Sequence, residues 1–292
     1  MQQINFKQVD VFTTAPYKGN PVAVIMDARG LSDSQMQSIA SWTNLSETTF
    51  VLPAEDHRAD YRVRIFTPVS ELPFAGHPTL GTAHALLESG CITPREGVLI
   101  QECAAGLIEL KVTAPDAAAM SISFRLPEPV ITPLTPGQTQ ELEEILGCPI
   151  DRSLAPARVD VGARWVVAKT TDAAQVLATT PDFARLAQHD AAMNITGICL
   201  YGLHAGASDM HIEARSFAPS CGVNEDPVCG SGNGSIAAFL RHHQVALPDD
   251  GIVRSSQGQK TGRDGKLVLR ITRDHIYVGG HAVTCIRGKI CA

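Results

Sequence analysis

Arg64-Ile65-Phe66-Thr67-Pro68 and Arg215-Ser216-Phe217-Ala218-Pro219 share the pattern Arg-x-Phe-x-Pro. Each stretch is followed by a short loop, a polar residue before proline (His77 and Asp226), and a run of small apolar residues. Further segments match in the same order: 19–24 with 162–167, and 46–52 with 196–202. The paired segments follow the same order in both halves, and the difference in residue number between partners changes only slowly along the chain. This pattern indicates an internal duplication with loop insertions.

Both halves show the same mixture of predicted elements. Alternating and apolar runs predict several strands in each half, and the small-residue runs predict one buried helix per half, starting near Thr79 and Ser235. The proline-rich passage 127–136 is typical of a linker. Strands that curl round one helix in each half give an α+β fold.

Composition narrows the class of protein. The chain has 292 residues, 44% of them hydrophobic, and a net charge of −6 without a basic stripe, so nucleic acid is not an expected partner. It lacks an apolar run long enough to span a membrane and a signal-peptide pattern at Met1, so we expect a cytoplasmic protein. The eight cysteines are irregularly spaced, without a CxxC pair, and are expected to be reduced. No metal motif is present, so we expect a site without metal or cofactor.

The glycine-rich stretch Gly230-Ser231-Gly232-Asn233-Gly234 precedes the second predicted helix. Backbone N–H groups at a helix start favour anions, so this stretch predicts a cradle for a substrate carboxylate. A glycine-rich capping loop without a ligand is the alternative. His77 and Asp226, each an ordinary capping residue if taken alone, gain interest because they stand at corresponding points of the repeat. If both helix starts face a cleft between the halves, these two residues oppose each other.

Glu47 stands among apolar residues, close to Leu45 and Phe50. A carboxyl in apolar surroundings has a raised pKa, which suits proton transfer near neutral pH. The second copy carries Gly197 at this point, so the fold does not require the charge.

Four of these segments together resemble the PhzF family, the phenazine-biosynthesis isomerases of the diaminopimelate-epimerase-like superfamily. The matching stretches are 19–24, 44–51, 64–77 and 215–231. The resemblance implies two pseudo-twofold-related domains, each a curved, mostly antiparallel sheet wrapped round a central helix. It implies domains 1–126 (completed by a C-terminal strand at about 278–292) and 127–277, an active site in the cleft between them, and a homodimer.

The resemblance also implies roles for individual residues. It makes Glu47 the proton shuttle of a cofactor-independent isomerase, which moves a proton between carbons of a small carboxylate substrate. It makes His77, Asp226 and Ser231 the residues that help to bind and protonate that substrate. We expect the surrounding substrate-binding positions to be Gly76, Cys229, Gly230 and Gly232.

Cys229 leaves an alternative open, because the phenazine enzymes carry Thr there and the related epimerases and racemases a catalytic Cys. Their partner Cys falls at Ala75, which excludes a two-thiol mechanism. A one-thiol epimerase, racemase or dehydratase of an amino or imino acid remains, with the pKa of Cys229 lowered at a helix start. A non-catalytic ligand-binding homologue is the third possibility.

Overall fold

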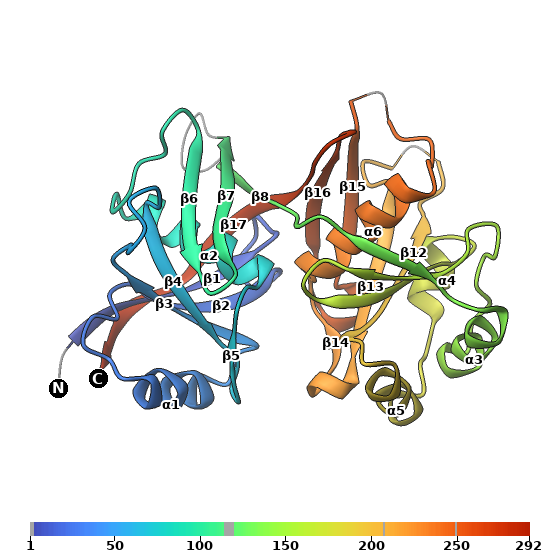
Figure 1. Cartoon of the computed structure of the whole chain (residues 1–292), viewed down its shortest axis with the longest axis horizontal. Coiled ribbons are helices and arrows are strands. Elements are labelled where there is room, and N and C mark those ends of the chain that lie inside the picture. The colour runs from blue at the N-terminus through green and yellow to red at the C-terminus, as the bar shows by residue number, and fades with distance from the viewer. Residues whose placement is uncertain (1–2, 114–119, 207, 249) are drawn as a thin grey trace. The chain divides into compact units, whose positions relative to one another are not determined.

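The computed structural model describes residues 3–113, 120–206, 208–248 and 250–292. The chain forms two compact units, unit 1 (1–125 with 279–292) and unit 2 (126–278). The α+β class predicted from the sequence is confirmed, and Figure 1 shows a strand-rich sheet around one helix in each unit. No helix in the described ranges is long and apolar enough to cross a membrane.

Unit 1 is a closed ring of strands around α2 (Gly76–Glu88). Its strands are β1 (Gln3–Val11), β2 (Asn20–Ile25), β3 (Glu47–Leu52), β4 (Tyr61–Phe66), β5 (Glu71–Leu72), β6 (Val98–Cys103), β7 (Gly106–Thr113) and β8 (Ser121–Arg125). The long β17 (Ile276–Cys291) closes the ring because it pairs with both β1 and β8. α1 (Asp33–Thr43) covers the outer face of β3 and β4.

Unit 2 repeats this plan around α6 (Gly230–His242). Its strands are β9 (Val130–Pro133), β10 (Ala157–Asp160), β11 (Arg164–Lys169), β12 (Gly197–Leu203), β13 (Ile212–Ala218), β14 (Val223–Asp226), β15 (Ile252–Gln257) and β16 (Gly265–Ile271). Its outer helices are α3 (Pro136–Leu146), α4 (Ala173–Ala178) and α5 (Phe183–Met193), with 3-10 turns η1 (Pro219–Cys221) and η2 (Gln259–Thr261).

The predicted duplication is confirmed by connectivity and register. In unit 1, β2 pairs with β3 in parallel, β3 with β4 antiparallel, β4 with β6 in parallel and β6 with β7 antiparallel. In unit 2, β11, β12, β13, β15 and β16 repeat that series. The register is also repeated, because Val22 lies opposite Glu47 and Trp165 lies opposite Gly197. The helices α1 and α5 both end at an asparagine in the left-handed conformation.

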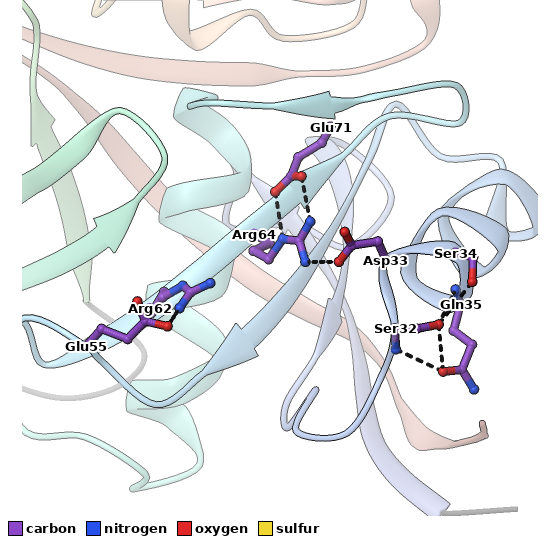
Figure 2. Close-up of polar contacts among 8 residues, drawn as sticks. All are labelled: Ser32, Asp33, Ser34, Gln35, Glu55, Arg62, Arg64 and Glu71. Carbon is purple, nitrogen blue, oxygen red and sulfur yellow. Dashed lines mark hydrogen bonds and ion pairs between the residues drawn. The ribbon is translucent and has the colours of Figure 1, made fainter.

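The repeated Arg-x-Phe pattern forms the same structural device in both units. The Arg64 guanidinium lies 5.1 Å from the Phe66 ring centroid and donates two hydrogen bonds to Glu71 (Figure 2). The Arg215 guanidinium lies over the ring of Phe217 and forks to Glu225 in the same way. Stacking and a bidentate carboxylate pair fix an arginine in one geometry, so the pattern anchors the hairpin that leads into each central helix.

Both central helices begin earlier than the sequence predicted. α2 begins at Gly76 instead of near Thr79, and α6 begins at Gly230 instead of near Ser235. The glycine-rich stretch is therefore the first turn of α6. A Cβ on Gly232 would lie 2.6 Å from the Sγ of Cys199, so the close approach of the sheet requires glycine there despite its poor helix propensity.

The proline-rich passage was also wrongly predicted as a linker alone. β9 lies within it and pairs with β10, placing Pro133 opposite Ala157. Proline is compatible with a strand at the edge of a sheet, where its missing N–H is not needed. All eight cysteines are free thiols, as predicted.

Candidate functional site

Glu47 is the first residue of β3 and its carboxyl is largely buried. Burial raises the pKa of Glu47 to about 7, and the hydroxyl of the neighbouring Ser46 acts in the opposite direction. Its Oε2 lies 3.2 Å from the Nε2 of His77. A carboxyl that titrates near neutral pH is present in both forms, so it can both accept and donate a proton. The predicted upward pKa shift is confirmed.

His77 is placed by the start of α2. It is the second residue of that helix and is buried, and Ala75 at the N-cap position supplies no side-chain cap. Backbone N–H groups of the first helical turn therefore keep their partial positive charge, which favours a negatively charged group near Gly76 and His77. The structure thus brings Glu47, His77 and Gly76 together within unit 1.

Cys229 caps the start of α6 in unit 2. Its Sγ accepts a hydrogen bond of 3.2 Å from the N–H of Gly232, and the side chain is buried. Burial raises the pKa of Cys229 well above its usual value, and the negative charge of Asp226 adds to the shift. The prediction of a lowered pKa is therefore wrong, because desolvation of the thiolate outweighs the helix N-terminus.

Ser231 is held by a residue that the sequence analysis did not identify. The Nε1 of Trp165 donates a 3.0 Å hydrogen bond to the Oγ of Ser231. With one lone pair occupied, the hydroxyl can still donate its proton, and the Sγ of Cys229 lies 3.6 Å from the same Oγ. Trp165 takes the place that Val22 has in unit 1, and this polar departure from an apolar repeat position is the signal that the sequence offered.

Gln257, on β15, fixes the loop before α6. Its Oε1 accepts from the N–H of Cys229 and from the side chain of Asn233, and its Nε2 donates to the carbonyl of Asp226. One side chain thereby ties β14 to the helix start. Nothing in the sequence around Gln257 distinguished it from its neighbours.

Asp226 and His77 do not stand at equivalent points of the repeat, contrary to the prediction. His77 is the second residue of its central helix, and the second residue of α6 is Ser231. Asp226 ends β14, before the N-cap residue Cys229. The mismatch arises because Pro78 lies inside the first turn of α2, a position that proline tolerates, whereas Pro227 precedes α6.

The structure therefore places the predicted residues in two groups, one in each unit. Unit 1 holds Glu47, His77 and Gly76, and unit 2 holds Asp226, Cys229, Gly230, Ser231 and Gly232. Gly232 has a clear structural role, because its N–H is engaged by Cys229 and its missing side chain makes room for Cys199. Among the residues that the structure describes, no group of three or more His, Cys, Asp or Glu side chains is arranged to hold a metal ion.

Comparison with known proteins gives matches along the whole chain. The profile of the PhzC–PhzF family, described as "Phenazine biosynthesis-like protein", matches residues 9–288. "Antisense-enhancing sequence 1" of Schizosaccharomyces pombe is 42% identical over 99% of both chains. The trans-2,3-dihydro-3-hydroxyanthranilate isomerase of Pseudomonas chlororaphis is 37% identical over 97% of both. A crystal structure of a PhzF-family phenazine biosynthesis protein from Bacillus anthracis superposes with a TM-score of 0.87 at 26% identity, covering 100% of both chains.

Proposed function

Because the chain belongs to the phenazine biosynthesis-like (PhzC–PhzF) family, whose named relatives include isomerases, we propose that it moves a proton between carbons of a small carboxylate substrate. Glu47 is the proton shuttle in this proposal. His77 orients the Glu47 carboxyl, and Asp226 and Ser231 bind and protonate the substrate.

The contact between Glu47 and His77 is the observation that carries this proposal. A buried carboxyl with a pKa of about 7 lies 3.2 Å from a buried imidazole at a helix start. Buried titratable groups with shifted pKa values are frequent at catalytic sites. A carboxyl whose pKa is near 7 can remove a proton as a carboxylate and return it as a carboxylic acid at neutral pH.

The proposed reaction moves a single proton, which Glu47 removes and then returns. The Glu47 carboxylate removes a proton from a substrate carbon, and the electron pair of that C–H bond delocalises toward the substrate's unsaturated system. The resulting carboxylic acid then returns the proton to a different carbon of the same molecule, which regenerates the carboxylate. Substrate and product are isomers, so neither an oxidant nor a co-reactant is consumed.

The one-thiol alternative receives less support. A base must be a thiolate, yet burial and the charge of Asp226 keep Cys229 protonated at neutral pH, and its sulfur already accepts from Gly232. These contacts describe a capping residue.

The test is proton NMR in D2O with trans-2,3-dihydro-3-hydroxyanthranilate, beside a panel of amino acids and hydroxyprolines. We expect the dihydro-anthranilate signals to disappear with the wild-type protein and to persist with Glu47→Gln. Glu213→Gln is the matched control, because Glu213 lies on β13 in unit 2 and burial also raises its pKa to about 7. It should keep full activity.

Two results would contradict the proposal. Full turnover by Glu47→Gln would remove the shuttle role of Glu47. Deuterium entering the α-carbon of an amino acid, with loss of activity in iodoacetamide that substrate prevents, would favour Cys229 instead.

A further inference from the structure

A surface cavity of about 380 Å³ lies on the outer face of unit 1, beside α1. Its apolar wall consists of Ala28, Leu31, Met36, Leu52, Pro53 and Ala54. Its polar side is formed by two arginines of β4, Arg62 and Arg64, and by Glu55. Figure 2 shows both guanidinium groups on the same strand. Cavities of this size, apolar with a few convergent polar groups, are typical of small-ligand sites.

The counter-charges of both arginines can be displaced. Arg62 pairs with Glu55, whose side chain is 74% exposed, and the Nη1 of Arg64 pairs with Asp33, whose side chain is 83% exposed. Ion pairs with such exposed carboxylates contribute little to stability. Glu71 still holds the other edge of the Arg64 guanidinium, so that group stays in place when Asp33 moves away.

Unit 2 shows what covers the same face of the duplicated fold. There α4 lies on β12 and β13. Its Val176 is fully buried in a hydrophobic cluster formed by the outer helices and the strands β11–β13. The Nη1 of Arg215, the counterpart of Arg64, donates to the carbonyl oxygens of Val176 and Thr179. Gly202, the counterpart of Leu52, has no side chain because the carbonyl of Asp172 occupies that space.

Among the described residues of unit 1, no helix lies in this place. Only the short connection 26–32 joins β2 to α1, whereas residues 170–182, which include α4, join β11 to α5. In unit 2, α4 thus packs the apolar side chain of Val176 on the sheet and supplies carbonyl oxygens to Arg215. In unit 1 the corresponding face is left as the cavity with its two arginines.

We propose that this cavity binds a small organic anion with an apolar body, such as an aromatic or branched aliphatic carboxylate. The anionic oxygens lie against Arg62 and Arg64 in place of Glu55 and Asp33, and the apolar body packs on Leu31 and Leu52. The cavity is separate from the Glu47 site. Glu47 and Leu52 are the two ends of β3, which is about 16 Å at the usual rise of a strand, and their side chains point to opposite faces.

The test is a titration of the full chain with 2-naphthoate, followed by NMR of the backbone amides. We expect saturable shifts at residues 28–31 and at the amides of Leu52, Ala54 and Glu55. Arg62→Gln should weaken the affinity about tenfold, the equivalent of one lost charge-assisted contact, and Arg62→Lys should recover part of it. The neutral analogue 2-naphthylmethanol should bind at least about tenfold more weakly than the carboxylate.

Arg58→Gln is the matched control, because Arg58 also pairs with a neighbouring carboxylate, that of Asp56, and does not line the cavity. It should leave the affinity unchanged. The proposal is overturned if 2-naphthoate produces no saturable shift at these amides, if Arg62→Gln and Arg58→Gln bind equally well, or if the neutral analogue binds as tightly as the anion.

Discussion

Glu47 and Gly197 occupy the same position in the two halves of the fold, and only one of them carries a side chain. Glu47 lies opposite Val22 in unit 1, and Gly197 lies opposite Trp165 in unit 2. A Cβ on Gly197 would lie 1.9 Å from the carbonyl oxygen of Phe217, so the second copy has no room there. The two copies therefore differ at this position because local backbone packing decides which copy has room for a side chain.

The predicted pKa shifts of the Glu47 carboxyl and the Cys229 thiol show what local sequence can reveal about a site. The apolar neighbours of Glu47 predicted its burial, and burial alone sets the direction of its pKa. For Cys229 the sequence showed the helix start but not the surrounding sheet, whose desolvation is the larger effect. Trp165 and Gln257 contact the start of α6 from distant strands, so their roles depend on tertiary contacts that spacing does not reveal.

Replacing Glu47 by glutamine should stabilise the protein at neutral and alkaline pH. The folded-state pKa of about 7 lies above the ordinary value of 4.5, so the folded protein holds an extra proton between these values and wild-type stability falls as pH rises through that window. Glutamine avoids this loss. Urea unfolding should show no gain at pH 4.5 and a gain of up to about 3 kcal/mol at pH 8, since one pKa unit is about 1.4 kcal/mol. A gain that does not change with pH would contradict this explanation.

At the scale of elements, strands were more predictable than helix starts. The apolar run of β3 and the alternating pattern of β4 are both typical of strands, because such patterns report directly on which faces are buried. α3 begins at Pro136, and a capping box formed by Thr135 and Gln138 marks its start. α4 is short and was missed, since six residues carry too little periodicity.

The central helices are fixed by contact with the sheet, and Gly81 tests this directly. A Cβ on Gly81 would lie 2.3 Å from the Cγ1 of Val22, a fully buried and conformationally restricted side chain. Gly81→Ala should therefore cost about 1–3 kcal/mol in urea unfolding, although alanine is the better helix former.

Gly137→Ala is the matched control for Gly81→Ala. Gly137 is exposed in α3, and a Cβ there meets no atom within 4 Å. It should stabilise the protein by up to about 1 kcal/mol through helix propensity alone. Equal effects of both substitutions would show that propensity, and not contact with Val22, decides whether glycine is needed.

At the scale of the whole molecule, the C-terminal strand completes a unit that begins at the N-terminus. β17 pairs with β1 from Gln3 to Val11. Its Thr284 and Arg287 donate to Glu88 at the end of α2, which also receives Lys7 of β1. Burial acts to raise the pKa of Glu88, but the hydrogen bonds from Lys7 and Thr284 outweigh it and lower that pKa to about 2, so the carboxylate stays ionised. Unit 1 therefore cannot form its closed ring until the last strand is present.

A chain that ends at Gly280 should lose the structure of unit 1 while unit 2 persists. The truncation removes the β17 partners of β1 and two of the three side chains that hold Glu88, whereas Ile276–Val278 stays with unit 2. Hydrogen exchange should show lost protection in β1, β8 and α2 and retained protection in β11–β13, because buried backbone groups without partners are costly. A chain ending at Ile290 is the control, because it loses only one pair of the β1–β17 ladder, that between Gln3 and Cys291, and it should exchange like the full chain. Uniform loss of protection in both units would mean that they fold as one cooperative body, and unchanged protection in β1 would mean that the ring does not depend on β17.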